Sequence, residues 1–334
     1  MNEPVTVRIV YPKTEGRIVL RTDQDWEKDI DPVAISDDGN CTEFLHRSAK
    51  PYFYFRPMLV RGEVRLLSLG QYIAIMNSKT TRQVYPHFFP DPENRVVDRL
   101  DVTSSKGVTH QVRVFTPPGY IENTLKRYPV VYMQDGQNLF FPHEAFAGEH
   151  WRIEETLTIL NTMNIIRKSI VVGIYPADRL NEYTSPGYED YGRFIVDDLK
   201  TRIDGDHRTL TGPEDTAVMG SSLGGVVSFY MAWNYPHIFG KAACMSSTFS
   251  FKDDLLQRVL SEEKKPIKLY LDSGWPEDNY EVTRSMNDVL LRRGFQSGQD
   301  LLYFAFPHAL HNERYWAMRS HIPFQFFFGK GSTY

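Results

Sequence analysis

A serine between glycines is the strongest candidate for chemistry in this 334-residue sequence. Residues 220–225 read Gly-Ser-Ser-Leu-Gly-Gly, which contains the pattern G-x-S-x-G with Ser222 at its centre. The apolar pattern predicts a strand over 216–219 and a helix over 223–234. A serine at such a strand-to-helix turn is typical of a nucleophile elbow, because the glycines permit a tight turn from which the hydroxyl projects. We therefore expect Ser222 to act as a nucleophile.

A base and an acid are predicted from the loops that follow two later strands. A serine hydroxyl is a weak nucleophile until a base removes its proton, and behind such an elbow the acid and then the histidine follow along the chain. The strand predicted at 301–306 is followed by His308 and His311, and the strand predicted at 267–272 is followed by Glu277 and Asp278. The pattern indicates a serine–histidine–carboxylate site and leaves the carboxylate open.

Four segments resemble the esterase family of α/β-hydrolases, which includes enterochelin esterases, feruloyl and acetyl-xylan esterases, S-formylglutathione hydrolases and mycolyl transferases. They are residues 128–140 (YPVVYMQDGQNLF), 179–183 (RLNEY), 220–225 (GSSLGG) and 311–316 (HNERYW). The resemblance implies an α/β-hydrolase fold, with Ser222 as the nucleophile and His311 as the base. It also implies that the catalytic domain follows an all-β domain like that of enterochelin esterases.

The sequence departs from the family pattern at the acid and at the base. Pro276 makes the acid loop one residue longer, which leaves both Glu277 and Asp278 as candidates; we predict Asp278, because a shorter side chain suits a buried carboxylate of fixed reach. The family often has glycines before its histidine, where this chain has His308-Ala-Leu310.

The oxyanion of an attacked ester needs two N–H donors. One is expected from Leu223, which follows the nucleophile, and the other from Gln137, in the loop after the predicted strand 129–134. Asp135 is interpreted as structural, fixing that turn. Arg179 and Glu182 are expected to form an ion pair that fixes a loop, with contact to an anionic substrate as a second role for Arg179.

The order of predicted elements indicates two domains. Short strands and turns predict an all-β, immunoglobulin-like sandwich over 1–94, and alternating strands and helices predict an α/β domain over 95–334. The proline-rich segment 86–93 is the expected boundary. Because this junction is short and stiff, we expect residues 1–94 to shape the substrate site.

Composition excludes several classes of protein. Lys and Arg number 38 and Asp and Glu 42, so the net charge is −4, which does not favour binding to nucleic acid. The two cysteines cannot form a disulfide framework.

Neither a signal peptide nor a membrane span is predicted, so the expectation is a cytoplasmic protein. His308 and His311 could share a face, and His143, Glu144 and His150 form a second local cluster, but neither set matches the motif H-E-x-x-H. No metal or cofactor is expected. The oligomeric state stays open, a homodimer included.

The sequence thus predicts a serine hydrolase that cleaves small carboxylic esters through an acyl-enzyme. Two alternatives are an acyltransferase that uses an alcohol acceptor and an inactive, carbohydrate-binding protein of hydrolase fold. The ester itself stays open between siderophore lactones, hydroxycinnamoyl or acetyl sugars, and thioesters.

Overall fold

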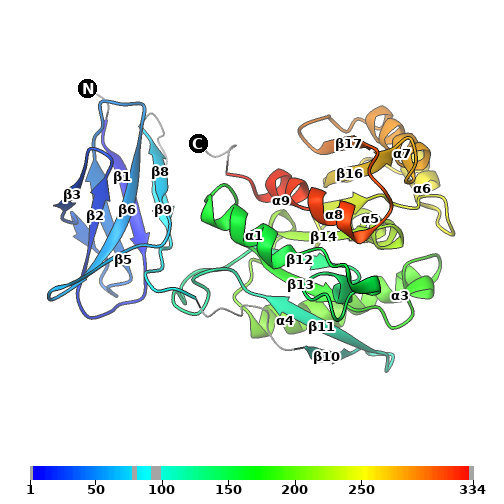
Figure 1. The fold of residues 1–334 in the computed structure, drawn as a ribbon, viewed down its shortest axis with the longest axis horizontal. Helices are drawn as coiled ribbons and strands as arrows, with labels where there is room; N and C mark the ends of the chain where they lie inside the picture. The colour runs from blue at the N-terminus through cyan, green and yellow to red at the C-terminus, as the bar shows by residue number, and fades with distance from the viewer. Residues whose placement is uncertain (1–2, 77–80, 92–98, 331–334) are drawn as a thin grey trace.

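A computed structural model of the chain describes residues 3–76, 81–91 and 99–330 (Figure 1). The N-terminal strands lie at the left of this view, and a mixed α/β part lies at the right. The domain boundary predicted between residues 94 and 95 lies outside the described residues.

The N-terminal strands pair into two sheets that face each other across a shared apolar core. One sheet has the order β4-β5-β1-β9, and the other has the order β3-β2-β6-β7, with β8 paired to β6. Alternate residues of each strand point inward, as expected for two packed sheets. Val7, Ile9 and Phe44 of the first sheet meet Leu20, Phe53 and Phe55 of the second. The strands are β1 Val5–Val10, β2 Arg17–Thr22, β3 Asp25–Ile30, β4 Ala34–Ile35, β5 Cys41–His46, β6 Tyr52–Arg61, β7 Val64–Leu67, β8 Tyr72–Ile75 and β9 Arg82–Val84.

The α/β part is built on one eight-stranded sheet of order β10-β11-β13-β12-β14-β15-β16-β17. β10 and β11 form an antiparallel hairpin at one edge, and β11 pairs antiparallel with β13. The strands β13, β12, β14, β15, β16 and β17 are parallel to one another. Parallel strands covered on both faces are continuously apolar, as in Val130–Met133 and Ile170–Ile174. The strands are β10 Leu100–Thr103, β11 Thr109–Phe115, β12 Val130–Met133, β13 Ile170–Ile174, β14 Thr216–Ser221, β15 Lys241–Met245, β16 Lys268–Trp275 and β17 Leu301–Pro307.

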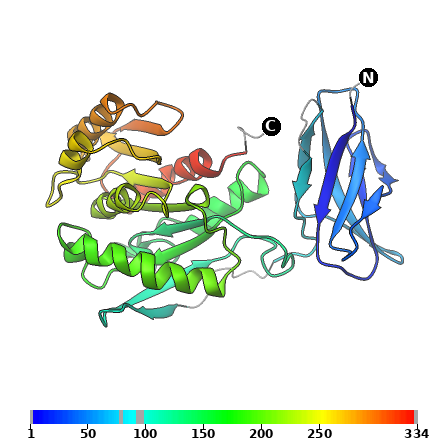
Figure 2. The ribbon, with the colours of Figure 1, turned by 180° about the vertical axis from the view of Figure 1, so that it is seen from behind.

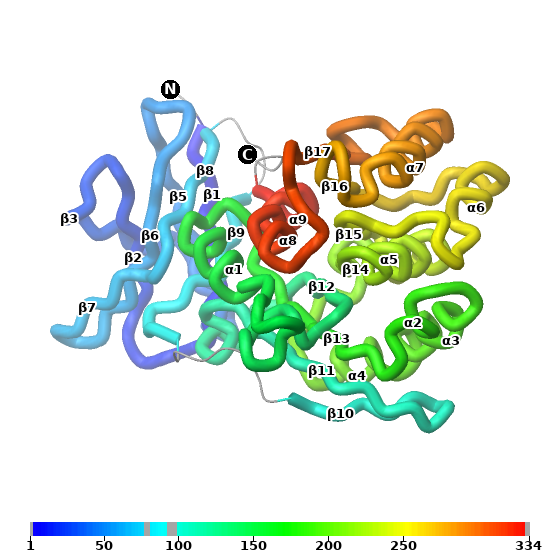
Figure 3. Tube along the Cα trace, turned by 45° about the vertical axis from the view of Figure 1, so that its right-hand side comes forward, coloured from blue at the N-terminus to red at the C-terminus, as the bar shows by residue number. Residues whose placement is uncertain are grey.

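Helices cover both faces of this sheet. On one face α1 Ile153–Thr162, α8 Glu313–Arg319 and α9 His321–Phe328 bury their apolar sides, and Figure 3 shows α9 beside α1. On the other face lie α3 Gly187–Arg193, α4 Lys200–Asp206, α5 Leu223–Asn234, α6 Leu255–Ser261 and α7 Tyr280–Arg292. A π-helical turn, η3 Phe194–Leu199, joins α3 to α4 into one continuous helix that crosses this face in Figure 2. Shorter turns are η1 Gly136–Asn138, η2 Phe146–Gly148, α2 Arg179–Glu182 and η4 Pro213–Asp215.

The α/β alternation predicted from the sequence agrees with these elements, and the missed helices are short. α6, α8 and α9 have seven or eight residues each, too few for a clear helical period. Within residues 3–76, 81–91 and 99–330, no helix has both the length and the apolar character needed to cross a membrane.

Side-chain hydrogen bonds join the N-terminal strands to the α/β part. Glu122 accepts from the Tyr11 hydroxyl at 2.8 Å and from the Phe88 N–H at 2.7 Å, and the Asn164 amide donates to the Gln71 carbonyl at 2.5 Å. Residues 119–123, after β11, and Asn164, before β13, lie at the edge where the parallel strands begin. Ligands of open α/β sheets bind at the opposite edge, where the strands end. These contacts therefore give no support to the expectation that residues 1–94 shape the substrate site.

Candidate active site

Ser222 lies in a strained turn between β14 and α5. Its φ of 56° and ψ of −125° fall outside the regions that residues other than glycine usually adopt. The turn needs the flanking glycines: a Cβ at Gly220 would lie 2.4 Å from the carbonyl oxygen of Gly224, and one at Gly224 would lie 3.1 Å from the Cβ of Gln134. The geometry is that of a nucleophile elbow.

His311 and Asp278 continue from Ser222 in one line of hydrogen bonds. The Nε2 of His311 lies 3.0 Å from the Oγ of Ser222, and its Nδ1 lies 2.6 Å from the Oδ1 of Asp278. Ser222 follows β14, Asp278 follows β16 and His311 follows β17. These strands are parallel, so their carboxyl ends lie at one edge of the sheet. Glu277 is exposed, and His308, the other histidine of its loop, is exposed as well.

The Asp278 carboxylate is held from two further directions. Its Oδ2 accepts hydrogen bonds from the Gly274 N–H and from the Ser246 hydroxyl, both at 2.7 Å, and only 1% of its side chain is exposed. A buried carboxylate whose two oxygens both accept hydrogen bonds has a fixed position. It can therefore hold the imidazole of His311 in one orientation and select the tautomer with hydrogen on Nδ1.

A second layer of charged groups, which the sequence analysis missed, lies beneath Asp278. The Arg319 guanidinium lies 3.1 Å from Asp272 Oδ1 and 3.9 Å from Asp278 Oδ2, and it donates to the Ser246 hydroxyl at 2.9 Å. The indole N–H of Trp316 donates to the same hydroxyl at 3.0 Å. Arg319 and Asp272 are buried, and burial raises the pKa of Asp272 to about 6. One feature of the sequence could have indicated this layer: Asp272 places a charged residue directly after the apolar run Leu269–Leu271.

Arg319→Met is expected to destabilise the fold by about 3–5 kcal/mol at pH 8, because it leaves two buried carboxylates without their cation. The loss should shrink as the pH falls from 8 toward about 6, because the pKa of Asp272, which Arg319 lowers, rises further without this cation, and the protonated carboxyl needs no cation. Urea unfolding at pH 8 and pH 5 measures both effects. Arg314→Met, at an exposed position of the same helix, is the control; equal stability of the two variants would refute the role of Arg319.

The predicted oxyanion donors, Leu223 and Gln137, come from two segments that pack together. Leu223 is the first residue of α5, where a backbone N–H has no partner within its own helix. Gln137 is the second residue of η1, and Asp135 directly precedes this turn. The Oδ2 of Asp135 is 3.3 Å from where a Cβ of Gly224 would stand. The loop after β12 therefore packs against the elbow. This arrangement resembles an oxyanion hole.

Arg179 and Glu182 do not pair with each other, so the predicted ion pair between them is wrong. Arg179 makes a bidentate pair with Asp135, at 2.8 and 2.9 Å, and its guanidinium lies over the Tyr183 ring. Glu182 instead lies 2.8 Å from the Nε2 of His110. Asp135 has a left-handed φ of 53°, so the Arg179 pair secures a turn that is unfavourable for an aspartate.

A site with these distances can carry out acyl transfer. The imidazole of His311 is within reach of the Ser222 proton, and the buried Asp278 carboxylate favours the charged imidazole that this transfer creates. The positive end of the α5 dipole also lies at Ser222.

Comparisons with known proteins agree with this fold. Residues 104–319 match the family described as "Putative esterase". "Uncharacterized protein YbbA" of Bacillus subtilis is 21% identical over 257 residues, covering 70% of this chain and 98% of its own. Among solved structures, the enterobactin esterase FES from Shigella flexneri in the presence of enterobactin has a TM-score of 0.60 at 13% identity and covers 98% of this chain and 93% of its own. A ferulic acid esterase has a TM-score of 0.58 at 16% identity, covering 70% of this chain and 97% of its own.

The sequence identity to these solved structures is low, so the likeness shows the fold alone. This fold is that of the α/β-hydrolase-like esterases. The family match covers more than half of the chain and includes Ser222, Asp278 and His311. On this evidence the chain belongs to the esterase family.

Proposed function

We propose that this protein hydrolyses carboxylic esters through an acyl-enzyme on Ser222. The observation that carries the proposal is the continuous line of hydrogen bonds from Ser222 through His311 to the buried carboxylate of Asp278. As the Ser222 oxygen attacks the ester carbonyl carbon, His311 Nε2 takes its proton, and Asp278 stabilises the imidazolium. The carbonyl oxygen becomes an oxyanion, which we expect the N–H groups of Leu223 and Gln137 to bind.

The second half of the cycle uses the same groups in reverse. The imidazolium gives its proton to the alkoxide oxygen, so the alcohol leaves and the acyl group stays on Ser222. His311 then takes a proton from water, whose oxygen attacks the acyl carbon. Return of that proton to Ser222 Oγ releases the carboxylic acid and restores the enzyme.

Rapid mixing with p-nitrophenyl acetate tests this proposal. We expect a burst of p-nitrophenol equal to the enzyme concentration, followed by slower turnover, because acylation of Ser222 by this activated ester releases p-nitrophenol faster than water removes the acetyl group. Adding methanol separates the alternatives: acetate as the main product supports the hydrolase, whereas methyl acetate as the main product would assign the acyltransferase. Absence of turnover on activated esters, with binding to sugars, would instead assign the inactive carbohydrate-binding protein.

Gly136→Ala is expected to lower the turnover number by about 10²–10³-fold, the cost of losing one oxyanion donor. A Cβ at Gly136 would lie 2.5 Å from the carbonyl carbon of Gly173, which is backbone of β13 and cannot move aside, so the Gln137 N–H must shift. Steady-state kinetics on an activated ester measures the loss. In the control Gly205→Ala, on α4, the new Cβ meets no atom within 4 Å; similar turnover for both variants would remove Gln137 from the mechanism.

Arg179 is proposed to hold this oxyanion loop in place through Asp135, and binding of an anionic substrate is its second proposed role. Its side chain is 40% exposed, so part of it is open to solvent. Arg179→Met should lower turnover of neutral and anionic esters by the same factor, about tenfold, if it acts on the loop alone. A larger loss for the anionic ester alone would assign the contact to substrate.

The two N-terminal sheets are proposed to form an immunoglobulin-like sandwich domain that ends near residue 94. Their shared core, and a likeness to the Shigella flexneri enzyme that extends over nearly the whole chain, support this assignment.

The likeness to an enterobactin esterase makes a siderophore lactone the first natural ester to assay. Feruloyl sugars, acetyl sugars and thioesters follow. Hydrolysis of a feruloyl sugar alone would move the substrate to that class.

A further inference from the structure

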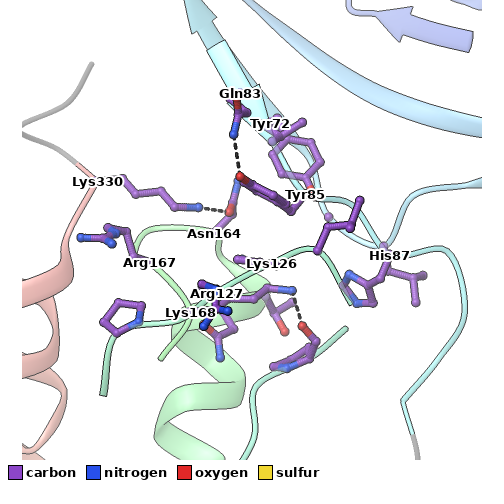
Figure 4. Close-up of a pocket in the computed structure, with 18 of the residues that line it drawn as sticks. Tyr72, Gln83, Tyr85, His87, Lys126, Arg127, Asn164, Arg167, Lys168 and Lys330 are labelled. Carbon is purple, nitrogen blue, oxygen red and sulfur yellow. Dashed lines mark hydrogen bonds between the residues drawn. The ribbon is translucent and has the colours of Figure 1, made fainter. Parts of the chain in front are cut away.

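A cavity of about 760 Å³ lies between the N-terminal strands and the α/β part (Figure 4). Its walls come from β8 and β9 on one side and from the segments before β12 and β13 on the other. These segments lie where the parallel strands begin, so the cavity is at the opposite edge of the sheet from Ser222. Support for the Ser222 site comes instead from Ser246, whose hydroxyl contacts Asp278.

Ser246 directly follows β15 and is fully buried in a strained conformation. Its φ of 44° is left-handed, which is unfavourable for a serine. The backbone is held there from both sides: its N–H donates to the Asp272 carbonyl at 2.7 Å, and its carbonyl accepts from the Asn279 side chain at 2.8 Å. A strained residue that the surrounding contacts hold in place is typical of a functional site.

The hydrogen of the Ser246 hydroxyl has one direction open to it. A hydroxyl has one hydrogen to donate and two lone pairs that accept. The Trp316 indole N–H, at 3.0 Å, and the Arg319 guanidinium, at 2.9 Å, can only donate, so they occupy both lone pairs. The remaining partner of this oxygen is Asp278 Oδ2 at 2.7 Å, which must therefore receive the hydrogen.

This hydrogen bond fixes the orientation of Asp278 and keeps it an acceptor. Its Oδ2 also accepts from the Gly274 N–H at 2.7 Å, so neither lone pair of this oxygen is left for a proton. Its Oδ1 lies 2.6 Å from His311 Nδ1, and a carboxylate that accepts there selects the tautomer with hydrogen on Nδ1. The bare Nε2 of that tautomer then faces the Ser222 hydroxyl at 3.0 Å.

We propose that Ser246 is a positioning residue for the reaction: its hydroxyl holds Asp278 in the charged state and orientation that select the working tautomer of His311. The inference rests on the proposed function of Ser222. Loss of the hydroxyl would free a lone pair of Asp278 Oδ2 and remove the acceptor of two buried donors. Asp278 could then turn, and both tautomers of His311 would be populated.

Two substitutions that remove the hydroxyl separate its role from that of the backbone. Ser246→Ala keeps a Cβ at the left-handed φ, whereas Ser246→Gly relieves that strain. We expect both to lower the turnover number on p-nitrophenyl acetate by about 10–100-fold, the cost of a misplaced catalytic group, with KM little changed. Ser247→Ala is the matched control and should keep wild-type turnover, because among the described residues the buried Ser247 hydroxyl has no hydrogen-bond partner. Urea unfolding shows whether each variant is folded.

The tautomer of His311 provides a second readout, which requires no ester. NMR of protein whose histidines carry the heavy nitrogen isotope, at alkaline pH, shows which ring nitrogen bears the hydrogen. The His311 signals are assigned by their loss in His311→Gln. We expect hydrogen on Nδ1 in the wild type and in Ser247→Ala, and a mixture of tautomers in Ser246→Gly and Ser246→Ala.

Wild-type turnover and an unchanged His311 tautomer in Ser246→Gly would overturn the proposal. A loss of turnover confined to Ser246→Ala would also overturn it, because the effect would then belong to the backbone. An equal loss in Ser247→Ala would do the same by assigning the effect to packing. If the wild-type protein hydrolysed no ester, the proposed function would fail, and the tautomer of His311 in Ser246→Gly would still decide the role of Ser246.

Discussion

Asp278→Asn is expected to lower turnover of an activated ester by up to about 10⁴-fold. The carboxylate accepts from His311 Nδ1 at 2.6 Å, whereas an amide at the same place can present its NH₂ group and favour the wrong imidazole tautomer. The Ser246 hydroxyl and the Gly274 N–H, which both donate to Asp278, would keep the amide in position. The loss should therefore appear in the turnover number and leave KM little changed.

Glu277→Gln is the matched control for this experiment, because it makes the same chemical change at the adjacent exposed carboxylate. We expect it to retain most of the activity. If Glu277→Gln were the inactive variant, the role of the acid would pass to Glu277. If both variants stayed active, the site would be a Ser–His pair oriented by another group.

Ser222→Ala is expected to lower turnover by about 10⁶-fold, because a serine and a base that act as a unit lose their function together. The fold should stay within about 0.5 kcal/mol of the wild type, since one hydroxyl at a half-buried turn contributes little to stability. Steady-state turnover and urea unfolding of the same preparation measure the two quantities.

The control for this variant is Ser221→Ala, which removes the neighbouring hydroxyl at the end of β14. It is expected to stay within a few-fold of wild-type turnover. Activity that survived in Ser222→Ala, or vanished equally in both variants, would remove Ser222 from its proposed role.

Sequence reasoning reached the line from Ser222 to His311 because local pattern and chain order restrict where those residues lie. Glycines around a serine, between a strand and a helix, define the elbow, and the carboxyl ends of parallel strands must meet at one edge. The same logic placed the acid after β16 and allowed a choice of Asp278 by side-chain length. The structure brings Asp278 to His311 and leaves Glu277 exposed.

Contacts between residues distant in the sequence were not accessible to that reasoning. Arg319 and Asp272 are 47 residues apart, and each reads alone as an ordinary charged residue. The expected partner of Arg179 is Glu182, three residues away, but its partner in the structure is Asp135, 44 residues away on another loop.

Labelling with a fluorophosphonate probe, followed by peptide mass spectrometry, tests the central claim most directly. The probe forms a covalent bond only with an activated nucleophile, and the line of hydrogen bonds through His311 predicts that this nucleophile is the Ser222 Oγ. We predict one adduct per chain, on the peptide that contains residues 220–225, in the wild type and in Ser221→Ala, and none in Ser222→Ala. An adduct on another residue, or none in the wild type while ester turnover persists, would contradict the account.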